Sequence, residues 1–215
     1  MVSIMNSNAV FSSHRIARLV SHCGEGKILW DIGCDHGLAG LLAGNSGAFD
    51  HVCFVDPSSF VIKKLKERLA ADIPKGFTYS IIEAKGEQIK VHSEKNVFLM
   101  AGFGGKPIIK SIQAIRKQLK APARFVVGPH KNTLAVREYL NRGEWHLVCE
   151  EIVEEAGQFY EILHLESRPG TPVSLFGTDQ WKAPAGERRR EDLLKKLPLH
   201  RNAQDQAFYK HLLTL

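Results

Sequence analysis

A short loop with two carboxylates beside glycines is the segment best suited to binding a charged ligand. It reads Asp31-Ile-Gly-Cys-Asp-His-Gly37 and directly follows an apolar run. Gly33 lets the backbone approach a ligand closely, and a helix beginning after the loop offers its N-terminal amides to a negative group. Asp31 and Asp35 would repel a diphosphate, but a carboxylate can pair with an ammonium group. The loop therefore favours a ligand with an ammonium and a carboxylate over a dinucleotide.

S-adenosylmethionine (SAM) carries both of these groups and no phosphate, so we predict that the loop binds SAM rather than NAD. The structural alternative is a capped turn. Asp56 ends the next apolar run, where an acid accepts hydrogen bonds from both ribose hydroxyls, although an Asp-Pro pair also starts turns. Glu87, next to Gly86, is placed to accept a hydrogen bond from the adenine amino group, with an exposed loop glutamate as the alternative.

A second glycine-rich run, Met100-Ala-Gly-Phe-Gly-Gly105, follows the fourth apolar run. Ligands of open α/β sheets bind at the carboxyl ends of the strands, and three glycines there indicate a floor where backbone approaches a substrate. Phe103 could stack on a base, with simple packing as the alternative. The predicted cofactor-binding residues are Asp31, Gly33, Cys34, Asp35, Asp56, Gly86, Glu87, Ala101 and Gly102.

The segments that must position these loops alternate between apolar runs and amphipathic stretches, which is typical of a parallel sheet with helices on both faces. We expect strands at 27–32, 51–55, 77–82, 96–101 and 124–127, and helices around 13–23, 38–42, 61–69, 107–119 and 133–141. Two further strands, 145–153 and 159–165, are joined by a tight turn and must pair antiparallel. This order predicts a Rossmann-like class I methyltransferase fold, α/β, with a seven-stranded, mostly parallel sheet and a C-terminal antiparallel hairpin.

The chain has 215 residues, of which 44% are hydrophobic, enough for one core. We expect a catalytic domain at 1–168 and a short basic extension at 169–215, helical around 187–196. From Thr178 onward, eight Lys or Arg face five Asp or Glu, about half of the net charge of +6. Such a surface attracts polyanions, and a mildly basic protein without such a partner is the alternative.

The remaining composition points to a cytoplasmic protein without a membrane segment. The N-terminus lacks a signal-peptide pattern, and no apolar run approaches the roughly 18 residues that a membrane span needs. The four cysteines show no C-x-x-C spacing, so neither a disulfide framework nor a metal site is expected. The sequence does not define the oligomeric state.

Several motifs resemble those of the TrmK family of tRNA adenine-N1 methyltransferases, with matching order and spacing from about Arg15 to Glu166. They are Asp31-Ile-Gly-Cys-Asp-His-Gly37, Gly102-Phe-Gly-Gly105, Gly128-Pro-His130, Arg137-Glu-Tyr-Leu140 and Glu154-Glu-Ala-Gly-Gln-Phe-Tyr-Glu161. The resemblance implies SAM binding, methylation of N1 of an adenine in the tRNA D-arm, and S-adenosylhomocysteine as product.

The sequence departs from the family pattern in three places. Gly128-Pro-His130 stands where the family has Gln-Pro-Asn, and Asp56-Pro57 stands where it has Gly-Glu. The family also carries a long C-terminal helical coiled-coil region, whereas only about 40 residues follow the catalytic domain here. These departures bear more on the substrate than on the cofactor.

If adenine N1 is the target, its lone pair needs no general base, and the product cation favours a nearby carboxylate. We therefore predict Asp35 as the stabilising group, with His36 orienting it or contacting the base, and His130 accepting from the adenine amino group. A duplexed base would have to be flipped out first. The predicted substrate-binding residues are Phe103, Gly104, Gly105, Arg15, Arg188, Arg189 and Arg190.

Other functions remain open from the sequence alone. A SAM-dependent methyltransferase could act on another RNA, a protein or a small molecule. An NAD(P)-dependent oxidoreductase is disfavoured by Asp35, and a non-catalytic RNA-binding module with a vestigial SAM fold is disfavoured by Asp31, Gly33 and Asp56. The arginine run 188–190 is equally compatible with an exposed helix face.

Overall fold

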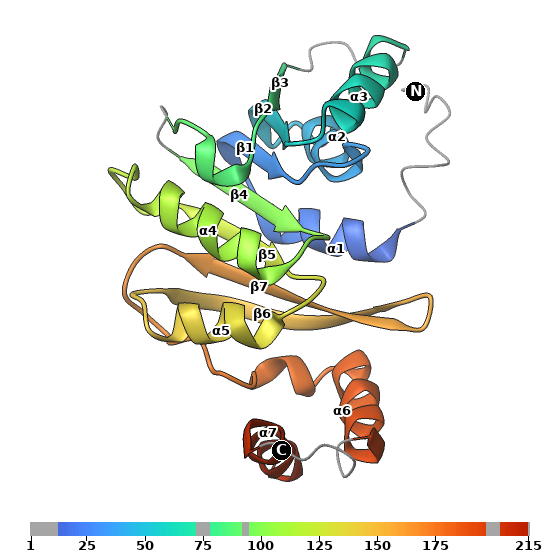
Figure 1. The fold of residues 1–215 in the computed structure, drawn as a ribbon, viewed down its shortest axis with the longest axis vertical. Helices are drawn as coiled ribbons and strands as arrows, with labels where there is room; N and C mark the ends of the chain where they lie inside the picture. The colour runs from blue at the N-terminus through green and yellow to red at the C-terminus, as the bar shows by residue number, and fades with distance from the viewer. Residues whose placement is uncertain (1–12, 72–77, 92–94, 197–202, 215) are drawn as a thin grey trace.

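A seven-stranded sheet runs through the middle of the molecule (Figure 1). The computed structural model describes residues 13–71, 78–91, 95–196 and 203–214. The strand order is β3-β2-β1-β4-β5-β7-β6, with β1 to β5 parallel and β7 antiparallel to both β5 and β6. The strands are β1 (Gly26–Ile32), β2 (Phe49–Asp56), β3 (Tyr79–Glu83), β4 (Asn96–Ala101), β5 (Arg124–Gly128), β6 (His146–Glu155) and β7 (Gln158–Glu166). The predicted sheet and its terminal hairpin are confirmed.

Helices cover both faces of the sheet because successive strand residues point to opposite sides. Leu29 and Leu99 pack under α1 (His14–Cys23), α2 (Leu38–Asn45) and α3 (Ser59–Ala71). Trp30 and Phe98 face α4 (Gly105–Arg116), α5 (Thr133–Asn141) and the 3-10 turn η1 (Gly86–Gln88). In α4, buried Ile108, Ile112 and Ile115 recur at helical spacing. The strand order reverses between β1 and β4, which places a ligand crevice at their carboxyl ends.

The C-terminal extension contains η2 (Asp179–Trp181), α6 (Pro184–Lys196) and α7 (Ala203–Leu213), which lie beyond β6 (Figure 1). The predicted helix at 187–196 is part of α6, which begins earlier, at Pro184, while α7 has no counterpart in the sequence prediction. Trp181 and Leu212 are buried against Ile152 of β6. No helix in the described parts of the chain combines the length and apolar character needed to cross a membrane.

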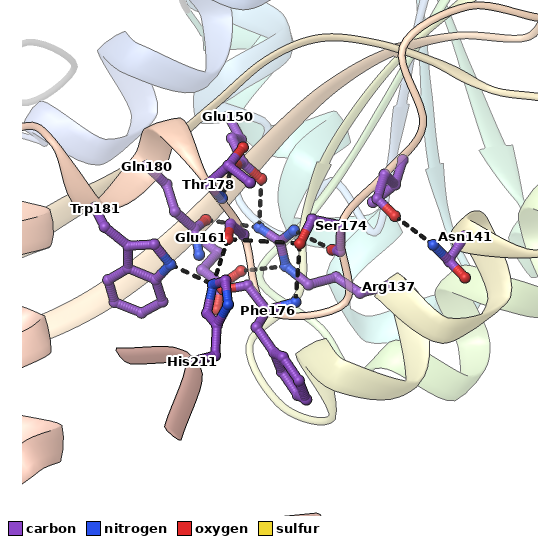
Figure 2. A network of polar contacts seen from close by, with 12 residues as sticks. Arg137, Asn141, Glu150, Glu161, Ser174, Phe176, Thr178, Gln180, Trp181 and His211 are labelled. Atoms are coloured by element: carbon purple, nitrogen blue, oxygen red, sulfur yellow. Dashed lines mark hydrogen bonds and ion pairs between the residues drawn. The ribbon is translucent and has the colours of Figure 1, made fainter. Parts of the chain in front are cut away.

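Arg137 of α5 is buried, and its guanidinium holds the extension to the sheet (Figure 2). Its Nε donates to Glu161 Oε2 at 2.8 Å, and its Nη2 donates to Glu150 Oε2 at 2.9 Å. The same guanidinium donates to the Ser174 carbonyl at 2.8 Å and to Gln180 Oε1 at 2.6 Å. The arginine therefore joins β6 and β7 to the segment that follows them.

The second carboxylate oxygen of Glu150 extends this network into the extension. It accepts hydrogen bonds from the backbone N–H and the hydroxyl of Thr178. One residue earlier in the chain, the Gly177 carbonyl lies 2.9 Å from His211 Nε2 of α7 (Figure 2). The resembling motifs around Arg137 and Glu161 thus have a structural role that links α5, the hairpin and the extension.

Candidate functional site

Two cavities that share Gly33 open at the carboxyl ends of the strands. The first has a volume of about 220 Å³, and the second about 470 Å³. Of the predicted site residues, the first cavity is lined by Arg15, Asp31, Gly33, Cys34, Asp35, His36, Ala101, Gly102 and His130. The second is lined by Gly33, Asp56, Gly86, Glu87 and Phe103. Every residue predicted to bind the cofactor therefore lines one cavity or the other.

Asp31 is the buried carboxyl group of the first cavity. Its Oδ2 accepts a hydrogen bond from the Gly40 N–H at 2.9 Å, which fixes the start of α2. Burial raises the pKa of Asp31 to about 7; the Gly40 bond opposes this shift, while the Asp56 and Asp35 charges add to it. A cationic ligand would offset this cost of ionisation, because an ammonium group beside Asp31 stabilises the carboxylate.

The loop after β1 is tied to β2 by its backbone. The N–H groups of Gly33 and Cys34 both donate to the Val55 carbonyl, at 2.8 and 3.1 Å. Asp35 has a positive φ of 48°, and its side chain is 70% exposed, with Oδ1 3.7 Å from His36 Nε2. The two predicted catalytic side chains of this loop therefore project from the surface at the mouth of the first cavity.

The Phe103 ring packs against Gly33, the residue that both cavities share. A Cβ atom at Gly33 would lie 2.6 Å from Phe103 Cδ1, closer than packed carbons approach. Gly33 also has a φ of 71°, a conformation that favours glycine. The glycine therefore brings the loop and the aromatic ring into contact, and the ring faces the second cavity.

Gly33→Ala is expected to weaken ligand binding at least tenfold, because the new methyl group must displace the Phe103 ring. Gly47→Ala is the matched control: its φ is 72°, and nothing lies within 4 Å of its Cβ position. Both variants carry the backbone strain of about 1 kcal/mol, but only Gly33→Ala meets the ring. Isothermal titration with S-adenosylhomocysteine measures the difference, and equal affinities in the two variants would contradict the role of the Gly33–Phe103 contact.

The second cavity is a mainly apolar slot whose charged lining residues are two acids, Asp56 and Glu87, and three lysines, Lys85, Lys106 and Lys110. Asp56 Oδ1 accepts from the Ser58 N–H at 2.9 Å, so the residue does start a turn, and it also lines the cavity beside Glu87. Gly86 packs η1 directly on α4, because a Cβ there would lie 2.3 Å from Ser111 Oγ. An apolar slot with carboxylate acceptors suits a flat base and a ribose with free hydroxyls.

The second glycine run is split between lining the cavity and packing. Gly102 lines the first cavity, and its N–H donates to the Gly128 carbonyl at 3.1 Å. Gly105 instead packs against the next loop: its N–H donates to the Lys131 carbonyl at 2.9 Å, and a Cβ there would lie 2.7 Å from the Asn132 carbonyl oxygen. Gly104 forms an isolated bridge with Lys131. Neither Gly104 nor Gly105 lines the two cavities.

Tyr160 is a residue that the sequence analysis did not single out, although it lies in one of the resembling motifs. Its ring centroid lies 5.3 Å from that of His130 and 4.6 Å from the Arg15 guanidinium carbon. Arg15 is also paired with Glu155 at 3.6 Å. Tyr160 thereby connects a predicted catalytic histidine to a predicted substrate-binding arginine at the rim of the first cavity.

The three consecutive arginines of α6 form ion pairs or hydrogen bonds with other residues of the chain. Arg188 pairs with Glu154 at 2.7 Å, Arg189 pairs with Asp192 at 2.9 Å, and Arg190 Nε donates to the Leu212 carbonyl at 2.8 Å. None of the three lines either cavity. Any contact they make with a substrate would lie away from the reacting atoms.

Together the cavities fit SAM in the chemistry of their donors and acceptors. The buried Asp31 carboxyl faces the space suited to an ammonium group, and the acids Asp56 and Glu87 border an apolar slot suited to adenosine. Gly33 lines both cavities, so a ligand that occupies the two would pass beside its backbone. A dinucleotide would instead place phosphates beside Asp31 and Asp35, which is electrostatically unfavourable.

The sheet order, the glycine loop after β1 and the acid after β2 define a class I methyltransferase. The family model for the methyltransferase domain matches residues 12–163, and the chain belongs to this family. The chain is 26% identical to a tRNA (adenine(22)-N(1))-methyltransferase of Bacillus subtilis, over 74% of this chain and 67% of that protein. The methyltransferase class predicted from the sequence is confirmed.

Solved structures share the fold over nearly the whole chain. A Streptococcus pneumoniae protein in complex with S-adenosyl-L-methionine has a TM-score of 0.79 at 20% identity, covering 93% of this chain and 95% of that one. TrmK of M. capricolum in complex with S-adenosyl-homocysteine has a TM-score of 0.72 at 12% identity, covering 94% and 93%. At these identities the likeness establishes the fold, including the C-terminal extension.

Proposed function

We propose that this protein transfers a methyl group from SAM to N1 of an adenine in the D-arm of tRNA. The observation that carries the proposal is the convergence of Asp31, Asp56 and Glu87 on two cavities that share Gly33. The Bacillus subtilis relative, named as a tRNA (adenine(22)-N(1))-methyltransferase, supports adenine N1 as the target atom. Relatives with bound SAM and S-adenosylhomocysteine support the cofactor.

The chain's own residues would act mainly by binding and alignment. SAM supplies an electrophilic methyl group, and adenine N1 already holds a lone pair, so no side chain has to remove a proton. Ala101 and Gly102 offer backbone close to the cofactor cavity, where a base can approach. The exposed Asp35 carboxylate at its mouth would stabilise the cationic product, and His130 would accept from the adenine amino group.

Methyl transfer from labelled SAM to unmodified tRNA tests the proposal. We expect label in 1-methyladenosine when the transcript carries adenine at nucleotide 22, the position in the relative's name, and none when guanine replaces that adenine. Equal labelling of both transcripts would place the target elsewhere. Tight binding of S-adenosylhomocysteine with no label in any tRNA would reject tRNA as the substrate while keeping the cofactor.

The affinity for S-adenosylhomocysteine is expected to fall as the pH drops below about 7. Burial holds the pKa of Asp31 near 7 in the free protein, and pairing with the ligand ammonium needs the ionised carboxylate. Below that pKa, each pH unit should weaken binding about tenfold, and above it the affinity should level off. The measurement is the dissociation constant from pH 5.5 to 8.5. Asp31→Asn serves as the control, and identical pH profiles in the two proteins would exclude Asp31 as the titrating group.

Arg188→Ala combined with Arg189→Ala is expected to weaken tRNA binding and to reduce its dependence on salt. For each arginine that neutralises a phosphate, its removal should lower the slope of log affinity against log salt concentration by about 1. Arg190 is left intact because it holds the Leu212 carbonyl of α7. An unchanged salt slope, measured by filter binding, would mean that this face of α6 does not bind tRNA.

A further inference from the structure

Three potential metal ligands from distant parts of the chain meet on the α1 face of the sheet. They are His22 in the last turn of α1, Cys149 of β6 and His164 of β7, and one ligand atom of each lies within 4.8 Å of the others. Cys149 Sγ lies 3.4 Å from His22 Nδ1 and 3.9 Å from His164 Nδ1. All three side chains are half-buried. The cluster is separate from the two cavities, because none of its members lines them.

An irregularity in β6 aims the cysteine at this cluster. Leu147 and Leu165 are paired and both belong to the core on the α5 side. The register then shifts between Leu147 and Cys149, so that Cys149 pairs with His164 on the opposite side. In an unbroken strand, residues 147 and 149 would share a face. A β-bulge that redirects one side chain is a recurrent feature next to functional sites.

We propose that His22, Cys149 and His164 form a zinc site. Zinc binds thiolate sulfur at about 2.3 Å and imidazole nitrogen at about 2.0–2.1 Å in a tetrahedral arrangement, which sets neighbouring ligand atoms about 3.5 Å apart. The observed sulfur–nitrogen distances of 3.4 and 3.9 Å bracket this value. Two imidazoles and one thiolate leave a fourth position for water.

The surroundings provide the contacts that a metal-binding histidine needs. Metal-bound imidazoles usually donate their other N–H to a carboxylate, and His22 Nε2 lies 3.0 Å from Glu151 Oε1. Arg18 in turn donates to both oxygens of Glu151, at distances of 2.6 to 3.2 Å, and so fixes the carboxylate. The anionic ligand of the site would be the Cys149 thiolate, because Glu151 is already paired with Arg18 at 2.6 Å.

The His164 ring presents its Nδ1 atom to the cluster. Its Nε2 is buried without a hydrogen-bond partner among the described residues, and its Nδ1 is directed at Cys149 Sγ. Buried polar atoms are seldom left unpaired without a reason. A metal bound through Nδ1 would leave this Nε2 unchanged, so the support for coordination comes from the direction of Nδ1 toward Cys149 Sγ.

Such a site would join α1 to the terminal hairpin. The same helix supplies Arg15 and Leu19 to the first cavity, so the metal would hold one wall of that cavity in position without touching a ligand there. The proposal stands independently of the substrate, since it rests on the cluster alone. The site could not be predicted from short motifs such as C-x-x-C, because His22 and Cys149 are 127 residues apart.

The test uses the full-length protein, stripped with a chelator and then titrated with Zn²⁺ against a chromophoric competitor, and in parallel with Co²⁺. We expect one tightly bound ion per chain, a thiolate-to-cobalt charge-transfer absorption, and a rise in Tm with zinc. Cys149→Ser is expected to abolish the absorption and to weaken zinc binding at least a hundredfold. Cys53→Ser, which removes a buried cysteine of β2, is the matched control and should behave as the wild type.

His22→Asn keeps the proposal testable if Cys149→Ser fails to fold. This variant should fold without metal, lose the zinc-dependent rise in Tm and weaken zinc binding to a similar extent. Absence of stoichiometric zinc binding in the wild type would overturn the proposal. So would zinc binding that neither substitution changes, since the ion would then lie elsewhere.

Discussion

Asp31→Asn is expected to weaken S-adenosylhomocysteine binding at least about thirtyfold at pH 8. At that pH the wild-type carboxyl, whose pKa is raised to about 7, is mostly ionised within a buried site. A ligand ammonium placed beside it gains a charge-assisted hydrogen bond in a region of low dielectric. Loss of one member of such a buried pair costs about 2–5 kcal/mol, which corresponds to roughly 30-fold to several thousand-fold in affinity.

The Asp31→Asn variant should fold normally, so a loss of affinity in this variant can be assigned to binding rather than to unfolding. Its side-chain oxygen can still accept from the Gly40 N–H, as Asp31 Oδ2 does. Because the folded pKa lies above the unfolded value, Asp31 contributes stability that is complete below about pH 4 and is lost as the pH rises through about 7. The variant lacks this loss, so at pH 8 its unfolding free energy should equal or exceed that of the wild type. Unchanged affinity in a folded variant would remove Asp31 from the cofactor site.

Arg137→Ala is expected to lower the free energy of unfolding by about 3–5 kcal/mol. The substitution leaves the buried Glu150 carboxylate without its cation, and breaking a buried pair on one side costs about that much. It also removes donors from the Ser174 carbonyl and from Gln180. Urea unfolding followed by tryptophan fluorescence measures the change, because Trp181 lies in the segment that the network holds (Figure 2).

Arg168→Ala is the matched control for this experiment. Arg168 also pairs with a glutamate, Glu166, at 2.6 Å, but its side chain is 46% exposed. Exposed pairs contribute about 0–1 kcal/mol, so this variant should lie close to the wild type. Arg137→Lys keeps the positive charge but loses the several donors of the planar guanidinium. Its free energy of unfolding should lie between those of Arg137→Ala and Arg168→Ala. A loss below 1 kcal/mol in Arg137→Ala would show that the network carries little of the stability.

The elements that bear the site could be predicted because their sequence patterns are local. The strand at 96–101 and the helix at 133–141 have the predicted bounds, and the short loop at 156–157 forces the hairpin. Each depends on an apolar run, on helical spacing or on turn residues within a few positions. The loop Asp31–Gly37 was recognised for the same reason, since its charges and glycines are contiguous.

Features that depend on tertiary packing could not be predicted in this way. Nothing in the sequence around Gly33 indicates that Phe103 lies against it, and the bulge at 147–149 becomes visible only in the pairing of β6 with β7. The sequence shows that Arg188 and Arg189 belong to a basic run. It does not show that they form ion pairs with Glu154 and Asp192. Long-range interactions of this kind become visible only when the strands and helices are placed.

The chain that follows the hairpin also protects the sheet from pairing with other molecules. β6 is one of the two edge strands of the sheet, and exposed edges are templates for aggregation. The returning segment covers part of this edge: the Thr171 carbonyl accepts from the Leu147 N–H at 2.8 Å, and η2 packs beside the strand. A protein truncated after Arg168 would therefore present an open strand edge, and we expect it to self-associate.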